Sequence, residues 1–232
     1  MYDRGASEFD FEIGCCVTNR LQELVILCVF KFNQRNACKM TDNDNIQVCI
    51  RMRRKIPREE NSENLWMVEN ASQITEIGPN HRPFVFDRVF GESDSTEHIY
   101  NELIAPVIHK AMEGINGTIF AYGQTSSGKT YTMLGSGDRN CQGIIPMCID
   151  HIYSEIEMIP NRAFLLKVSY FEIYNDRVTD LLSLEDRNLD LLEDENGDIH
   201  VSNCTEEIVN SPAVAMNLMK KGEAKRRFKR HR

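Results

Sequence analysis

The chain has 232 residues, of which 41% are hydrophobic and 27% charged, so it is long enough to bury a core and has the composition of an ordinary globular domain. Its formal net charge of -8 at pH 7 argues against a whole-molecule attraction to nucleic acid or to anionic membranes, and leaves only a local basic patch for binding a polyanion. We therefore expect neither a nucleic-acid partner nor a membrane partner.

The amino-terminal region has no pattern typical of a targeting or membrane-spanning segment. The apolar run over 21–32 contains Gln22, Glu23 and Lys31 and falls short of the roughly 20 residues that span a bilayer. The residues before it are acidic and lack the basic start of a secretion signal. The eight cysteines form no C-x-x-C pair and no zinc-binding spacing, so we expect reduced, mostly packed thiols in a cytoplasmic protein.

The first 44 residues are expected to form a poorly ordered amino-terminal arm, because apart from the apolar run they show no clear helical or alternating period. The stretch 33–45 is polar and typical of a linker. Alternation of apolar and polar residues begins at 46–51, which predicts a strand in a segment that Pro57 closes. A second short strand is predicted over 83–87, which is rich in strand-forming residues.

A helix is predicted over about 94–113, with apolar residues on one face. Asp94 and Glu97 have the spacing of a capping box, and Gly114 is placed to end the helix. Pro106 lies inside this pattern and should kink the helix or break its hydrogen-bond ladder locally. The apolar positions are Ile99, Leu103, Ile104, Val107, Ile108, Ala111 and Met112.

The remaining pattern alternates strands and helices, which favours an α/β sheet covered by helices on both faces. Residues 118–122 predict a buried strand, 123–128 a loop, and residue 129 the start of a helix. The later elements are a helix over 144–156 with Pro146 in its first turn, a strand over 164–174, a break at Asn175 and Asp176, and a strand over 178–182.

An eight-residue run between the strand at 118–122 and the following helix matches G-x-x-x-x-G-K-[ST] at each fixed position. Its members are Gly123, Gln124, Thr125, Ser126, Ser127, Gly128, Lys129 and Thr130. Glycines allow successive N–H groups to turn toward phosphate oxygens, and the following helix directs its positive end at the same anion. Lys129 would contact the β and γ phosphates, and Thr130 would coordinate Mg²⁺. The run predicts ATP or ADP with Mg²⁺ as ligands; the alternative is a glycine-rich turn that binds nothing.

The sequence around this loop resembles kinesin motor domains. The stretch 116–133 is similar to the kinesin signature, and the similarity extends over about 45–227. Further similar pieces stand in kinesin order at 86–90, 143–146, 168–176 and 180–182. The stretches 104–106 and 163–166 are most similar to the centromere-associated kinesins of the mitotic spindle.

The resemblance implies a P-loop NTPase fold, a mixed sheet flanked by helices, in a partial motor domain over 45–232. It implies a microtubule-stimulated ATPase that moves along tubulin tracks, in the cytoplasm and on the cytoskeleton, at the spindle or kinetochore. Met40 resembles a normal motor start, so we hypothesise that residues 1–39 are an appended arm. Neither the oligomeric state nor the cargo is indicated.

Three further residues match the adenine side of the family's site. Arg51 and Arg53 match the two arginines of its first strand, and Tyr131 matches the aromatic residue that stacks on the base. Ordinary helix-surface packing is the alternative role of Tyr131. Arg54 stands where the family usually has proline, and a flexible charged side chain does not offer the fixed apolar edge that proline does.

The family's two switch motifs, roughly N-x-x-S-S-R and D-x-x-G, are not found after the loop, and we predict no catalytic residue. Residues 194–197 fit D-x-x-G in letters, but they precede the expected first switch and are interpreted as a surface turn. The chain is therefore expected to be truncated before the switch regions, to bind nucleotide without efficient turnover, and to leave apolar sheet edges unpaired.

The basic tail over 225–232 is compatible with nuclear import or phosphate binding, although such runs are more often solvated ends. The segment that matches an early tubulin-contact loop, 193–200, is acidic here, so weak microtubule binding is expected. Two functions remain open: a motor-type ATPase or its fragment, and a non-hydrolysing nucleotide-binding or partner-binding fragment. Another P-loop enzyme such as a small kinase would need a lid and a second acidic strand, which we do not find.

Overall fold

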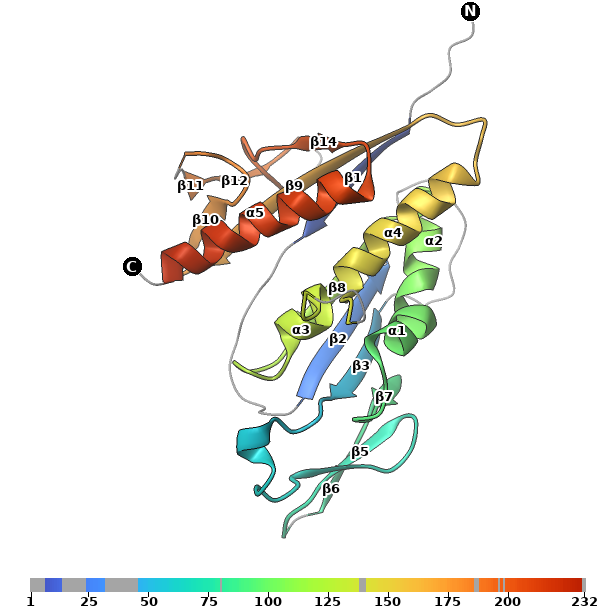
Figure 1. The fold of residues 1–232 in the computed structure, drawn as a ribbon, viewed down its shortest axis with the longest axis vertical. Helices are drawn as coiled ribbons and strands as arrows, with labels where there is room; N and C mark the ends of the chain where they lie inside the picture. The colour runs from blue at the N-terminus through green and yellow to red at the C-terminus, as the bar shows by residue number, and fades with distance from the viewer. Residues whose placement is uncertain are drawn as a thin grey trace, which may run out of the picture. The chain divides into compact units, whose positions relative to one another are not determined.

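The computed structural model describes residues 7–13, 24–31, 46–79, 81–137, 141–185, 188–195, 197 and 199–230. Contacts divide the chain into two compact units, one formed by residues 17–151 and the other by residues 1–16 and 152–232. Figure 1 shows the elements of both units along the chain. None of the described helices is long and apolar enough to cross a membrane.

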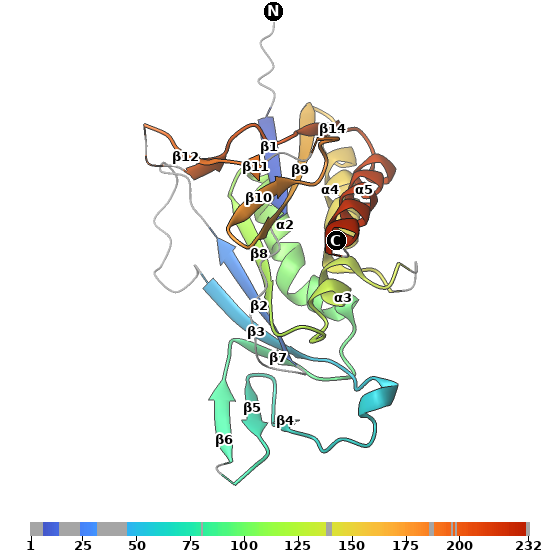
Figure 2. The ribbon, with the colours of Figure 1, turned by 90° about the vertical axis from the view of Figure 1, so that its left-hand side faces the viewer.

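The main sheet of the unit 17–151 has the strand order β7-β3-β2-β8 within the described residues. Its strands are β7 (Arg88–Phe90), β3 (Ile46–Met52), β2 (Leu24–Lys31) and β8 (Gly117–Tyr122). β3 and β7 are parallel, whereas β2 is antiparallel to both of its neighbours. Figure 2 shows β2 and β3 next to each other, with β8 beside β2. The strands predicted at 46–51 and 118–122 are confirmed.

Strand β8 is less buried than predicted. Its first two residues are exposed and its other four are half-buried. The physical reason is its place in the sheet, because among the described residues it pairs with β2 alone and therefore forms an edge.

A second, three-stranded sheet in the same unit consists of β4 (Trp66–Val68), β5 (Gln73–Glu76) and β6 (Arg82–Val85). β6 corresponds to the strand predicted over 83–87, but it lies in this small antiparallel sheet and its residues are exposed. The buried side chains of Ile50, Ile74 and Val89 join the small sheet to β3 and β7. Between β3 and β4, Pro57 begins the short 3-10 helix η1 (Pro57–Glu59) instead of ending β3.

The predicted helix over 94–113 is built from α1 (Thr96–Ile99), the π-helical segment η2 (Tyr100–Ile104) and α2 (Ala105–Met112). Pro106 stands in the first turn of α2, and directly before it the N–H of Ala105 donates to the carbonyl of Tyr100, five residues back. Pro106 has no N–H group to donate, and the wider π turn directly before it accommodates this missing hydrogen bond. The expected local break is therefore a π segment.

The capping box predicted from Asp94 and Glu97 is wrong. The N-cap is Ser95, whose hydroxyl accepts from the N–H of His98 at 3.0 Å. Asp94 instead accepts from the N–H of Gly91 at 2.7 Å. The predicted apolar face is confirmed, since all of its members except the half-buried Ala111 are buried.

Two more helices follow in chain order. α3 (Lys129–Leu134) begins where predicted and has six residues, and α4 (Ile144–Glu157) matches the helix predicted over 144–156. Four cysteines have described side chains, and none of these four is in a disulfide: Cys49 and Cys148 are buried, Cys204 is half-buried and Cys141 is exposed. Burial raises the pKa of Cys148 to about 12, which keeps this thiol protonated and unreactive.

The other unit is organised around the long strand β9 (Phe164–Tyr174), as predicted. Its strand neighbours are parallel β1 (Ser7–Ile13) and antiparallel β10 (Arg177–Asp180) and β14 (Glu207–Val209). β10 also pairs with β11 (Asn188–Leu189), and β12 (Leu191–Glu193) pairs with β13 (Ile199–Val201). Asn175 and Asp176 have φ of 51° and 58° and form the tight hairpin turn between β9 and β10.

β10 ends at Asp180, two residues earlier than predicted. One carboxylate oxygen of Asp180 accepts from the N–H groups of Leu182 and Ser183, at 2.8 and 3.0 Å, which turns the chain out of the strand. The other accepts from the N–H and the hydroxyl of Thr205, at 2.8 and 2.6 Å. The side chain is fully buried. Burial alone would raise the pKa of Asp180, but these hydrogen bonds outweigh it and hold the pKa below its ordinary value.

The long helix α5 (Pro212–Arg230) extends through most of the basic tail. The Lys225 ammonium donates to the backbone carbonyls of Asp180, Ser183 and Glu185, at 2.7, 2.7 and 3.1 Å. Arg226 is buried and pairs with Glu223 at 2.6 Å. The first two residues of the tail therefore dock the helix and are not part of a solvated end; residues 231 and 232 lie outside the described residues.

The unit around β9 should lose stability in acid because of Asp180. Since the folded-state pKa of Asp180 is lowered, its contribution is complete above the unfolded-state pKa of about 4 and is lost as pH falls through the lower folded value. Asp180→Asn should cost about 1–3 kcal/mol at pH 7, because its amide N–H₂ would face other donors, and less below pH 4. Urea denaturation from pH 7 to pH 3 measures this. The exposed Asp190→Asn is the control, and an equal cost at both pH values would contradict the prediction.

Candidate functional site

The predicted phosphate loop lies between β8 and α3 and has a tightly turned backbone. Gly128 has φ 106° and ψ 12°, a left-handed conformation that side chains with a Cβ rarely adopt, and it forms the N-cap of α3. Ser126 also has a positive φ of 70°. The N–H of Ser127 donates to the carbonyl of Gln124 at 3.2 Å. The loop therefore contains a tight turn between Gln124 and Ser127.

Lys129 is folded over this loop. Its ammonium group donates to the carbonyls of Gly123 and Gln124, at 2.6 Å each, and the side chain is half-buried. The hydroxyl of Ser127 is buried and has no hydrogen-bond partner in the described part of the chain. Thr130 is exposed in the first turn of α3. A positive charge, an unused donor and an accessible hydroxyl therefore gather at one turn, which fits a magnesium-bound phosphate chain.

Arg51 attaches α3 to the sheet. Its guanidinium donates to the hydroxyl of Thr132 at 2.9 Å, in a buried contact, and lies 5.5 Å from the centre of the Tyr131 ring. Burial lowers the pKa of Arg51 from its ordinary value, but an arginine remains charged in proteins. Tyr131 is 45% exposed. The structure therefore brings together Arg51 and Tyr131, which were both predicted to lie on the adenine side.

Arg53 contacts both the loop and the segment after β3. It forms a two-pronged ion pair with Glu59, with distances of 2.7 and 3.0 Å, and also donates to the carbonyl of Ser126 at 3.2 Å. The hydrogen bond from Arg53 lowers the pKa of Glu59. Arg54, which replaces the family's proline, donates to the carbonyl of Glu92 at 2.9 Å. Arg53 thus links the loop to η1, whereas Arg54 binds a different segment.

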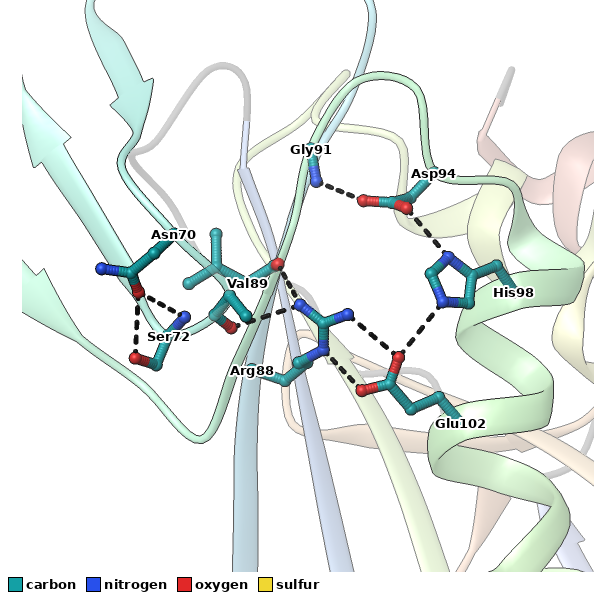
Figure 3. A network of polar contacts seen from close by, with 9 residues as sticks. Asn70, Ser72, Arg88, Val89, Gly91, Asp94, His98 and Glu102 are labelled. Carbon is teal, nitrogen blue, oxygen red and sulfur yellow. Dashed lines mark hydrogen bonds and ion pairs between the residues drawn. The ribbon is translucent and has the colours of Figure 1, made fainter.

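A network of charged residues, shown in Figure 3, was not predicted from the sequence. Arg88 and Glu102 form two hydrogen bonds, at 2.5 and 3.1 Å, which lower the pKa of Glu102 and raise that of Arg88. His98 lies between two carboxylates, 2.8 Å from Asp94 and 3.2 Å from Glu102. The network connects β7 to the helix pair α1 and η2. Arg88 lies in the kinesin-like stretch 86–90, which was the only signal available.

A cleft of about 670 Å³ lies beside this network and does not include the phosphate loop. Its walls come from both sheets and from the segment after β7. It is lined by Met52, Asn64, Trp66, Met67, Val68, Asn70, Ala71, Arg88, Val89, Gly91, Glu92, Ser93 and Asp94. None of the predicted site residues, 123–131 together with Arg51 and Arg53, lines this cleft.

The family model for the kinesin motor domain matches residues 35–232. The chain belongs to the kinesin motor domain family. It is similar to centromere-associated protein E from Homo sapiens, with 42% identity over 195 residues, which cover 82% of this chain and 7% of that protein. Kinesin-like protein KIN-7K from Arabidopsis thaliana, described as chloroplastic, is 44% identical over 79% of this chain and 19% of its own length.

Among solved structures, a fast kinesin matches with a TM-score of 0.71 and 32% identity, over 76% of this chain and 51% of the solved chain. The predicted α/β kinesin fold of the P-loop NTPase type is confirmed. The similarity to the centromere-associated branch is also confirmed, and plant kinesins show similar identities. The chain spans about half of that solved structure and at most a fifth of these curated relatives. Kinesins as a family are microtubule motors.

The contact between Arg51 and Thr132 should make a measurable contribution to stability. A double-mutant cycle with Arg51→Ala and Thr132→Val should give a coupling energy of about 1–2 kcal/mol, because the hydrogen bond is buried and its donor is charged. Urea denaturation of the four proteins measures it. The matched cycle with Arg54→Ala, whose guanidinium binds Glu92, should give a coupling near zero, and equal couplings in both cycles would contradict the assignment.

Proposed function

We propose that this chain binds ATP or ADP with Mg²⁺ through residues 123–130, as the nucleotide site of a kinesin-type microtubule motor. The observation that carries the proposal is the position of Lys129. Its ammonium group donates to the first two carbonyls of a loop that ends at Gly128, a residue in the left-handed conformation. The membership of the family supports it, because kinesin motors bind nucleotide with magnesium.

Each part of the loop has a distinct task in this proposal. The ammonium of Lys129 and the backbone N–H groups of 123–128, apart from that of Ser127, which donates to Gln124, hold the phosphate oxygens, and the buried hydroxyl of Ser127 gains the partner that it lacks. The exposed hydroxyl of Thr130 is the protein ligand of Mg²⁺. When bound, the magnesium ion neutralises phosphate charge.

We assign the adenine side to the group formed by Tyr131, Arg51 and Arg53. The half-exposed ring of Tyr131 offers one face for stacking, since the guanidinium of Arg51 lies over the ring. Arg53 donates to the carbonyl of Ser126 and so holds the loop next to this ring. Arg54 is directed to Glu92, and we therefore leave it out of the site.

Removal of the lysine side chain should abolish tight nucleotide binding. Lys129→Ala deletes a charge-assisted contact worth about 1.5–3 kcal/mol, so the affinity for fluorescent ADP in Mg²⁺ should fall about 10- to 100-fold. Titration by fluorescence anisotropy measures it, with and without a magnesium chelator. The exposed Lys220→Ala is the matched control and should bind like the unaltered chain. Unchanged affinity in Lys129→Ala would refute the proposed site.

A second candidate is a chain that binds nucleotide or a partner without hydrolysing ATP. The only D-x-x-G match in the 232 residues, at 194–197, lies between β12 and β13, where the N–H of Gly197 donates to the carbonyl of Asp194 at 3.0 Å. Both residues are exposed, which is typical of a surface turn. The sequence contains no N-x-x-S-S-R motif. These observations favour binding over turnover for this chain.

Turnover and track binding separate the two candidates. Phosphate release by the purified chain should be slow and little changed by microtubules, because no described group is placed to orient an attacking water. Co-sedimentation with microtubules should be weak and should decrease with added salt. Strong microtubule stimulation of phosphate release would instead establish a working motor ATPase of the cytoskeleton, and tight salt-resistant pelleting would refute the weak-binding expectation.

A further inference from the structure

The strand that leads into the phosphate loop is held in its sheet by β2. β2 pairs with β8 from Ile26 opposite Tyr122 to Lys31 opposite Gly117, and with β3 from Leu24 opposite Met52 to Phe30 opposite Ile46. β3 and β8 do not pair with each other in the described part of the chain. Without β2, the backbone groups of β8 would have no strand partner there.

The sequence of β2 suits this central position. Residues 24–30 are apolar without alternation, a pattern typical of strands that are covered on both faces. β1 has a different pattern, because Phe9, Phe11 and Ile13 alternate with acidic residues, and among the described residues it pairs with β9 alone.

Both neighbours of β2 belong to the kinesin match, whereas β2 does not. The match begins at residue 35, so it includes β3 and β8 and excludes residues 24–31. An empty gap between β3 and β8 would leave unpaired N–H and C=O groups along both strands, at a high cost in free energy. The gap must therefore be filled by an extended segment.

We propose that the gap between β3 and β8 is a binding site for an extended apolar strand, and that this chain fills it with its own residues 24–31. The amino-terminal arm is then a part of the folded unit and not a dispensable extension. Because β8 runs directly into Gly123, the position of the phosphate loop depends on this strand; this last step rests on the proposed nucleotide binding.

Disulfide trapping tests the register without disturbing the fold. Cys28 lies opposite both Val48 and Phe120. In an antiparallel strand, the N–H and C=O of one residue point to the same neighbour, so Cys28 forms a non-hydrogen-bonded pair with one of the two, at about 4.5 Å between Cα atoms. That spacing fits a disulfide. Mild oxidation of full-length Val48→Cys and Phe120→Cys should give a bond to Cys28 in at least one of them, mapped by mass spectrometry.

The same variants carrying Cys28→Ser should lose that disulfide, which excludes bonds to other cysteines. Absence of a bond to Cys28 in both Val48→Cys and Phe120→Cys would overturn the proposal.

Proline substitution tests the dependence of β8 on β2. Successive N–H groups of a strand point to opposite neighbours, so Leu27→Pro and Cys28→Pro each remove a hydrogen bond to a different strand. Hydrogen exchange should become at least 10-fold faster over 117–122 in one of these variants and over 46–52 in the other, with 164–174 unchanged. Leu27→Val, which keeps the N–H group, should behave like the unaltered chain. Unchanged exchange over 117–122 in both variants would overturn the proposal.

The affinity for fluorescent ADP should fall in the proline variant that loosens 117–122. If the unaltered chain binds no ADP, the proposed function fails, and the disulfide and exchange results still decide the strand site. If the unaltered chain and the loosened variant bind ADP equally well, the dependence of the loop on β2 is refuted. The exchange data then decide the strand site independently.

Discussion

Backbone pairing of β8 is the constraint on which the position of the predicted phosphate loop depends. A phosphate loop is a set of N–H groups in a fixed arrangement, and this arrangement requires that both of its ends be held. At one end, β8 is attached to the sheet through β2. At the other, α3 is attached through the buried hydrogen bond from Arg51 on β3 to Thr132. The two ends of the loop are thus attached to β8 and β3, which belong to one sheet but do not pair with each other in the described part of the chain.

The charged side chains at the loop form hydrogen bonds with carbonyl groups of the loop itself. Lys129 satisfies its ammonium group with carbonyls of its own loop, and Arg53 satisfies a third loop carbonyl while its charge is paired with Glu59. A phosphate chain would compete with these two neutral carbonyl acceptors for the ammonium group of Lys129. The exchange therefore favours the anion, since charge-assisted hydrogen bonds are stronger than neutral ones.

In the other unit, basic residues serve the fold. Lys225 binds three carbonyls around the end of β10, and Arg226 is buried against Glu223, which also accepts from the hydroxyl of Tyr170. A Cβ on Gly222 would clash with the ring of Tyr170, so α5 approaches β9 as closely as glycine permits. Part of the basic run in the sequence thus docks α5 onto its own unit. Fewer of its positive charges are therefore left to bind an acidic partner.

The sequence by itself determined the features that depend on spacing along the chain: the loop between β8 and α3, the apolar face of the helix over 94–113, the break at Asn175 and Asp176, and the family. Whether residues 1–44 are poorly ordered as a whole, and whether the loop binds nucleotide, stay predictions. Only the tertiary structure decided that residues 24–31 lie between β3 and β8, that Ser95 caps the helix in place of Asp94, and that Arg88 pairs with Glu102. The physical reason is that groups distant in sequence compete for the same hydrogen-bond partner. A local sequence pattern does not indicate which of these groups forms the bond.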